Sequence, residues 1–133
     1  IAGLCRNLGS QSLACTLRGL SLYNTAKRVR RQVLKEAWLG LVNGALLGVI
    51  AGAGMYIVAS RHPEQVDAQI MGLVAGSAMA LSCMLSGFLG AAMPLILRKF
   101  GHNPAMAANL VMSGLSDILC LSLFLLLAVN FAL

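Results

Sequence analysis

Three long stretches of this sequence carry a single charged side chain between them, that of Asp117. A helix needs roughly 20 mostly apolar residues to cross the hydrocarbon core of a bilayer, and each stretch reaches that length. Helices in soluble proteins are usually shorter. The sequence therefore predicts an all-α membrane protein, a bundle whose three transmembrane helices span residues 37–59, 69–97 and 104–131.

Composition and cysteine spacing exclude several other classes of protein. Hydrophobic residues make up 59% of the 133 residues and charged residues 11%, whereas about a quarter of an ordinary soluble domain is charged. No Ser-His-Asp, Cys-His or paired-carboxylate arrangement can be assembled, so we expect no enzyme. The four cysteines form no Cys-x-x-Cys pair. We expect Cys5, Cys15, Cys83 and Cys120 to be small apolar thiols in helix contacts.

The first residues of the sequence are too interrupted to span a membrane. Arg6 and Arg18 leave only the eleven residues 7–17 uncharged between them. We expect residues 1–17 to be the end of an earlier membrane segment, and the chain to be a fragment of a longer protein.

Basic residues predict the orientation in the membrane. Segment 18–36 carries six Lys and Arg residues, against one in the loop 60–67 and two in 98–103. Short cytoplasmic loops are enriched in these residues, so 18–36 is predicted to be a cytoplasmic connector of a multi-pass plasma membrane protein, with the C-terminus outside. The cluster would contact anionic lipids rather than nucleic acid, through Lys27, Arg28, Arg30 and Arg31.

Small residues recur along the first two apolar stretches. Lipid tails give helices no hydrophobic reason to associate, so small residues that allow close backbone contact select the packing face. The spacing predicts tight packing through Gly40, Gly44, Gly48 and Gly52 of the first stretch and Gly72, Gly76 and Ala80 of the second. Pro94 is expected to bend the second helix near its cytoplasmic end.

Asp117 is the most informative single residue. At about 1.5 Å per residue it lies roughly 20 Å along the helix from Pro104, near the midplane of the bilayer. An ionised carboxylate facing lipid costs at least about 2.5 kcal/mol. We therefore expect an ion pathway rather than a structural salt bridge, for which Arg6 is the candidate partner if the N-terminal segment re-enters the membrane. A weakly polar stripe beside Asp117 is expected to face water or a second copy; it consists of Asn109, Ser113, Ser116 and Cys120.

Three segments carry a resemblance to the membrane domain of the MgtE family of magnesium channels and transporters. "NLGSQSLACTLRGLSL" (7–22) resembles the family's Asn-x-Gly-x-Gln segment, and "LKEAWLGLVNGALLG" (34–48) its helix entry with Gly-x-x-x-Gly. "GAAMPLILRKFGHNPAMAANLVMSGLSD" (90–117) resembles a longer run that ends in Leu-Ser-Asp.

The resemblance implies that the chain holds the C-terminal part of that domain, from the end of the second of five membrane helices. It also implies a homodimer with one central pore lined by the second and fifth helices. The metal-binding carboxylate of the pore would be Asp117, and the residues that line or support the pore would be Asn7, Gln11, Asn109, Ser113 and Gly114.

The chain departs from the family pattern at Arg6. Cys5-Arg6 stands where the family usually has Gly-Gly before the asparagine. A guanidinium near a cation pathway raises an electrostatic barrier, so Arg6 is expected either to point to the cytoplasmic interface or to signal altered selectivity, altered gating or a lost function.

A single carboxylate per chain suits a hydrated magnesium ion. Mg²⁺ dehydrates reluctantly and is held through one or two carboxylates. Two copies of Asp117 across a two-fold axis would neutralise one transported Mg²⁺. The alternative is a proton- or sodium-coupled carrier that uses Asp117 as its relay. A non-transporting assembly subunit would explain the glycines but not Asp117.

Overall fold

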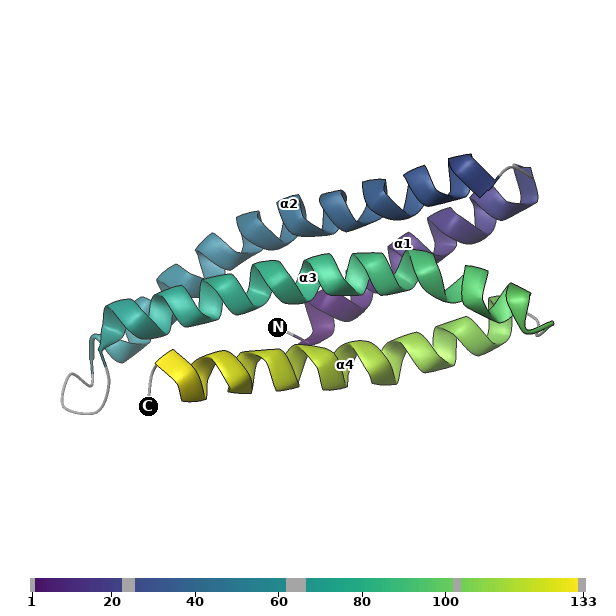
Figure 1. The fold of residues 1–133 in the computed structure, drawn as a ribbon. Helices are drawn as coiled ribbons and strands as arrows, with labels where there is room; N and C mark the ends of the chain where they lie inside the picture. The colour runs from purple at the N-terminus through teal and green to yellow at the C-terminus, as the bar shows by residue number, and fades with distance from the viewer. Residues whose placement is uncertain (1, 23–25, 62–66, 102–103, 132–133) are drawn as a thin grey trace.

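The computed structural model describes residues 2–22, 26–61, 67–101 and 104–131, and every regular element within them is a helix. Three helices are long and apolar enough to cross a membrane, over Arg30–Ala59, Ala68–Lys99 and Ser113–Phe131. The all-α class and the three membrane-spanning helices are thus confirmed. In chain order the elements are α1 (Ala2–Leu22), α2 (Ala26–Ala59), α3 (Ala68–Lys99) and α4 (Pro104–Phe131) (Figure 1).

Helix α3 is the centre of the bundle. It lies between α2 and α4 and packs against all three other helices (Figure 1). Helix α1 packs mainly against α3 and α4, and its N-terminal end lies about half-way along the bundle. The first helix therefore reaches the depth at which α4 carries its carboxylate. The buried residues of α3 are mostly small: Val74, Ala75, Ala78, Met79, Ser82, Cys83, Ser86, Gly87, Gly90, Ala91 and Pro94.

The predicted glycine faces bring α2 and α3 into backbone contact. A Cβ atom added to Gly48 would lie 2.6 Å from the carbonyl oxygen of Gly76, and one added to Gly52 would lie 2.7 Å from that of Gly72. Real Cβ atoms do not approach a carbonyl oxygen that closely. Any larger residue would therefore push the two helices apart, which confirms the packing prediction.

Small residues also set the contact between α1 and α3. Gly90 faces the backbone of Gly9 so closely that a Cβ atom would overlap the Gly9 carbonyl. Four residues further on, Pro94 lies buried inside α3 and gives the carbonyl of Gly90 no amide donor, which favours a bend. The helix ends before Gly101, whose φ of 74° is a left-handed conformation that suits glycine.

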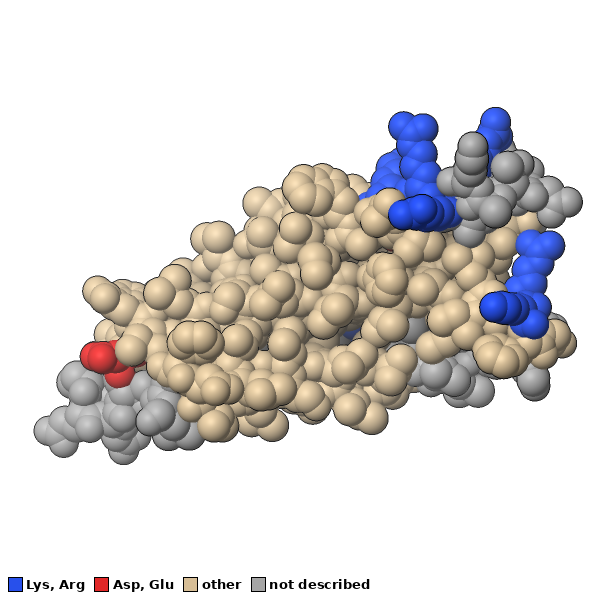
Figure 2. Space-filling model, viewed as in Figure 1, with Lys and Arg blue, Asp and Glu red and all other residues tan. Residues whose placement is uncertain are grey.

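Most of segment 18–36 is helical, because α1 continues to Leu22 and α2 begins at Ala26. Lys and Arg residues gather at the end of the bundle where α2 begins and α3 ends (Figure 2). Arg28, Arg30 and Arg31 are exposed there, whereas the side chain of Lys27 lies outside the described residues. The acidic residue Asp67 lies at the opposite end, where α3 begins.

Candidate functional site

Asp117 lies in the middle of α4 and forms an ion pair with Arg6 of α1. The Nη1 atom of Arg6 is 3.5 Å from the Oδ2 atom of Asp117. The side chain of Arg6 is 51% exposed and that of Asp117 35% exposed, so neither is enclosed in the core of a single chain. The candidate partner named from the sequence is therefore next to the carboxylate, in the middle of α4 and away from the end of the bundle that carries Arg28, Arg30 and Arg31.

The second carboxylate oxygen of Asp117 is unpaired. Oδ1 is buried from solvent and accepts no hydrogen bond from the part of the chain that the structure describes. A buried oxygen that accepts no hydrogen bond lowers the stability of the protein. The oxygens of an ionised carboxylate can accept hydrogen bonds but cannot donate them. Oδ1 can therefore accept a hydrogen bond from a ligand such as the water shell of a cation, provided that the side chains that cover it move aside.

Ser86 of α3 hydrogen bonds to the residues that directly precede the two charged residues. Its hydroxyl donates to the backbone carbonyl of Cys5 at 2.5 Å, and its oxygen lies 3.4 Å from the hydroxyl of Ser116. Because the Ser86 hydroxyl has one proton, Ser116 must donate in the second bond. Cys5 directly precedes Arg6 and Ser116 directly precedes Asp117, so one side chain fixes both helices next to the ion pair.

Three buried thiols form a cluster close to the ion pair. Cys5, Cys83 and Cys120 come from three helices and are 0–2% exposed. The sulfur atoms of Cys5 and Cys83 are 3.5 Å apart. Three of the four cysteines thus sit in helix contacts, whereas Cys15 is exposed.

The weakly polar stripe of α4 does not face water throughout. Ser116 is 1% and Cys120 2% exposed, because both are small enough to pack against the other helices of the same chain. For these two residues the expectation of a face toward water or a second copy is wrong. Ser113 is half-buried and has a partner of its own, and the side chain of Asn109 lies outside the described residues.

The pore residues expected on α1 lie on its outer surface. Asn7 and Gln11 are one turn apart and both are exposed. On the other side of the helix, Ser12 donates a hydrogen bond to the carbonyl of Gly87 at 2.7 Å and anchors α1 to α3. Gly114 of α4 is also exposed, and a Cβ atom added there would meet nothing within 4 Å.

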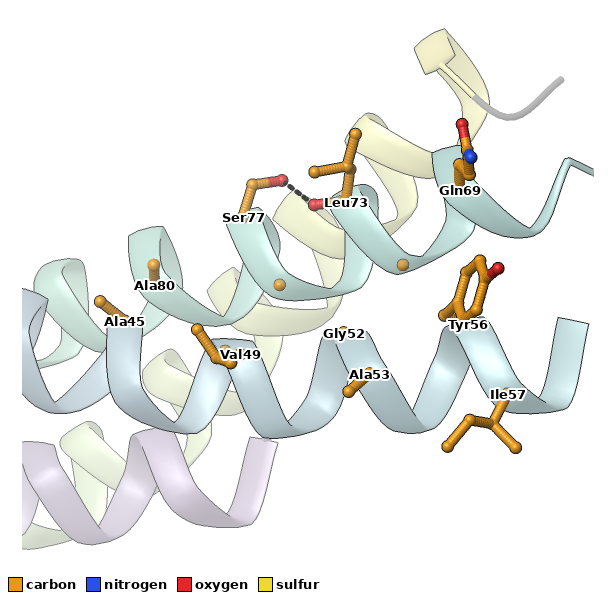
Figure 3. A pocket seen from close by; sticks show the side chains of 13 residues that line it. Ala45, Val49, Gly52, Ala53, Tyr56, Ile57, Gln69, Leu73, Ser77 and Ala80 are labelled. Carbon is orange, nitrogen blue, oxygen red and sulfur yellow. Dashed lines mark hydrogen bonds between the residues drawn. The ribbon is translucent and has the colours of Figure 1, made fainter.

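A hollow between α2 and α3 offers few ligands to an ion. Its lining is almost entirely apolar, and the hydroxyl of Ser77 already donates to the carbonyl of Leu73 at 2.7 Å (Figure 3). Tyr56 and Gln69 lie together at one end of this groove. No charged side chain lines it, so the ion site is better placed at Asp117.

Within the described residues no three His, Cys, Asp or Glu side chains are arranged to hold a metal ion. Among the described residues, Asp117 is the carboxylate that lies in the middle of a helix long and apolar enough to cross a membrane. Comparison with known families agrees with this picture, because residues 1–127 match the family model for MgtE, described as a divalent cation transporter. The chain belongs to the MgtE family.

Curated MgtE proteins from three bacteria are similar to the chain over most of its length. The magnesium transporter MgtE of Enterococcus faecalis is 30% identical over 119 residues, 89% of this chain and 25% of the relative. Those of Bacillus subtilis and Thermus thermophilus are 28% and 30% identical over 98% and 94% of the chain, which cover 28% and 26% of the relatives. The chain therefore spans about a quarter of the length of these relatives.

Membership in the MgtE family confirms several of the sequence-based predictions. The family is one of transporters and not of enzymes, and the three apolar helices make the chain a membrane protein.

Sequence reasoning missed Ser86 and the thiol cluster. The signal was the run of small residues Ser82, Cys83, Ser86 and Gly87, which occupies one face of α3 at helical spacing.

Proposed function

We propose that this MgtE protein transports Mg²⁺ across the membrane through a pore formed by two copies of the chain, with Asp117 at its middle. The relatives named as magnesium transporters support the ion. The observation that carries the proposal is the buried, unpaired Oδ1 of a carboxylate at the centre of an otherwise uncharged helix.

One carboxylate per chain fits a hydrated dication. Mg²⁺ keeps several of its waters in proteins and is seldom held by a complete cage of side chains. Oδ1 of Asp117 can accept a hydrogen bond from such a water once the side chains that cover it move aside, and the carboxylate attracts the ion strongly in surroundings of low dielectric constant. Two copies of Asp117 together balance the charge of one Mg²⁺.

The exposed polar surface of α1 supports a second copy. Asn7 and Gln11 face outward from α1, and lipid tails offer no hydrogen bonds to amide side chains. Water in a pathway or another protein chain would satisfy these side chains. In the proposed dimer they line the pathway together with α4.

The charge distribution supports an orientation and a lipid contact. In this proposal the end that carries Arg28, Arg30 and Arg31 lies in the cytoplasm, following the enrichment of basic residues on that side (Figure 2). The same residues then face the headgroups of the cytoplasmic leaflet, whose anionic lipids attract them.

Flux in liposomes tests the role of Asp117. The complete protein is reconstituted with a Mg²⁺-sensitive dye inside the vesicles, and Asp117→Asn is compared with the wild type. The matched control is Asp67→Asn, which removes an exposed carboxylate that makes no side-chain capping bond at the start of α3. We expect Asp117→Asn to fold and lose most of the flux and Asp67→Asn to keep it. Normal flux in Asp117→Asn would overturn the proposal.

A pH gradient separates the pore from the coupled carrier. In a pore, Mg²⁺ flux at a fixed membrane potential does not follow a proton gradient. In a proton-coupled carrier that uses Asp117 as a relay, the flux changes sign or size with that gradient. Such a dependence, lost in Asp117→Asn, would replace the pore by the carrier.

A further inference from the structure

We infer that Arg6 is a tethered counter-ion of Asp117 that an incoming cation has to displace, and that this competition makes the site select divalent over monovalent cations. The inference rests on the proposed function, since it assigns a selectivity mechanism to the same carboxylate. Its basis is the ion pair between α1 and α4, which neutralises the one charge in the middle of α4.

The ion pair is loose enough to be exchanged. A tight charge-assisted hydrogen bond between a guanidinium and a carboxylate measures about 2.7–2.9 Å, whereas Nη1 of Arg6 lies 3.5 Å from Oδ2 of Asp117. Half of the Arg6 side chain is exposed, so it has room to swing away. The pair holds one carboxylate oxygen and leaves the other without a donor within the described residues.

The free oxygen gives the exchange a route. Oδ1 is closed to solvent while Arg6 stays in place, so a hydrated cation approaches the exposed part of Asp117 and places a water on Oδ1 only as the side chains around it move aside. The guanidinium then leaves as the cation moves in, so the carboxylate never stands unpaired. Arg6 clears the site by a movement of its side chain, which is 51% exposed.

No other charge competes at this depth. In the part of α3 and α4 that the structure describes, the remaining charged side chains lie at the ends of α3, namely Asp67, Arg98 and Lys99. The net charge at this depth is therefore the sum of the charges of Arg6 and Asp117, which is zero.

A tethered cation discriminates by valence. A monovalent ion that replaces Arg6 exchanges one positive charge for another, and it competes with a group held at high effective concentration by its own chain. A dication has twice the Coulomb attraction to the same carboxylate at the same distance. Arg6 thus excludes K⁺ and Na⁺ while raising the Mg²⁺ concentration needed to fill the site.

The test compares three variants of the complete protein in liposomes. Arg6→Gln removes the charge, Arg6→Lys keeps it, and Arg18→Gln removes the same charge about 18 Å further along α1 as the matched control. We expect Arg6→Gln to lower the half-saturating Mg²⁺ concentration by about fivefold or more and to admit K⁺. Arg6→Lys and Arg18→Gln should still exclude K⁺.

The outcomes separate this inference from the proposed function. Mg²⁺ flux in the wild type, with an unchanged half-saturating concentration and unchanged K⁺ exclusion in Arg6→Gln, would overturn the inference alone. A wild type that carries no Mg²⁺, beside an Arg6→Gln variant that carries K⁺, would overturn the proposed function alone. If Arg6→Gln does not fold, Arg6→Lys decides, because loss of K⁺ exclusion with the charge retained would contradict the inference.

Discussion

Ser86 of α3 donates a hydrogen bond of 2.5 Å to the backbone carbonyl of Cys5 in α1, one residue before Arg6. The same hydroxyl oxygen accepts from Ser116, one residue before Asp117. The central helix therefore determines the separation of the two charged residues, although neither of them belongs to it.

Removal of the Ser86 hydroxyl should loosen this arrangement. Ser86→Ala leaves the Cys5 carbonyl and the Ser116 hydroxyl without their buried partner, so we expect a loss of about 1–3 kcal/mol in the free energy of unfolding. The Mg²⁺ flux should fall as well. Ser77→Ala is the control, because the exposed Ser77 hydroxyl bonds only to carbonyls of its own helix. Equal stability of the two variants in detergent would contradict the role of Ser86.

Glycines in α2 should differ in their tolerance of a methyl group. Gly48→Ala places a Cβ atom 2.6 Å from the Gly76 carbonyl oxygen and should destabilise the protein by about 1–3 kcal/mol. Gly54→Ala meets no atom within 4 Å and should change the stability by less than about 1 kcal/mol. Thermal unfolding in detergent measures both, and similar melting temperatures would show that α2 and α3 do not pack through these glycines.

Cross-linking should detect the second copy. In a Cys15→Ala background, which removes the exposed native thiol, a cysteine introduced by Gly114→Cys should form a disulfide between two chains under mild oxidation. Ile50→Cys is the control, since Ile50 is 70% exposed on α2 at the other side of the bundle. A cross-linked product from Ile50→Cys alone would place the interface between copies on α2.

A charge exchange should separate the structural ion pair from the ion pathway. The double variant Arg6→Asp/Asp117→Arg keeps one positive and one negative side chain at the same two positions. We expect its melting temperature to recover relative to either single variant, because an unpaired charge in the membrane is unfavourable. Its Mg²⁺ flux should remain low, since a cation on α4 repels the ion. Full flux in the double variant would leave Asp117 as a structural partner only.

The architecture could be predicted from the sequence because its determinants are local. The length of an apolar run specifies a membrane helix, and the four-residue spacing of Gly40, Gly44, Gly48 and Gly52 specifies a packing face. Both are visible without knowing which helices are neighbours. The stretch predicted as a transmembrane helix over residues 104–131 lies in the helix Pro104–Phe131, of which Ser113–Phe131 is long and apolar enough to cross a membrane.

The site could be predicted only in part, because it depends on contacts between distant residues. Asp117 stood out by its charge, and Arg6 was its candidate partner only if the N-terminal segment re-entered the membrane, which a separation of 111 positions along the chain could not decide. The direction in which the Ser116 and Cys120 side chains point could not be predicted either. Small residues of this kind suit a water-lined face and a helix contact equally well, and the position of α1 decides between them.

The position of α1 also has a consequence for biogenesis. The ribosome synthesises Arg6 long before Asp117, so the ion pair between them cannot form until α4 has been synthesised. By contrast, α2 and α3 follow each other directly and can pair through their glycines as soon as both have left the translocon. The ion pair is therefore a late step of assembly: α1 can dock on α3 through hydrogen bonds of Ser12 and Ser86 before α4 exists, but Arg6 has no counter-ion until then.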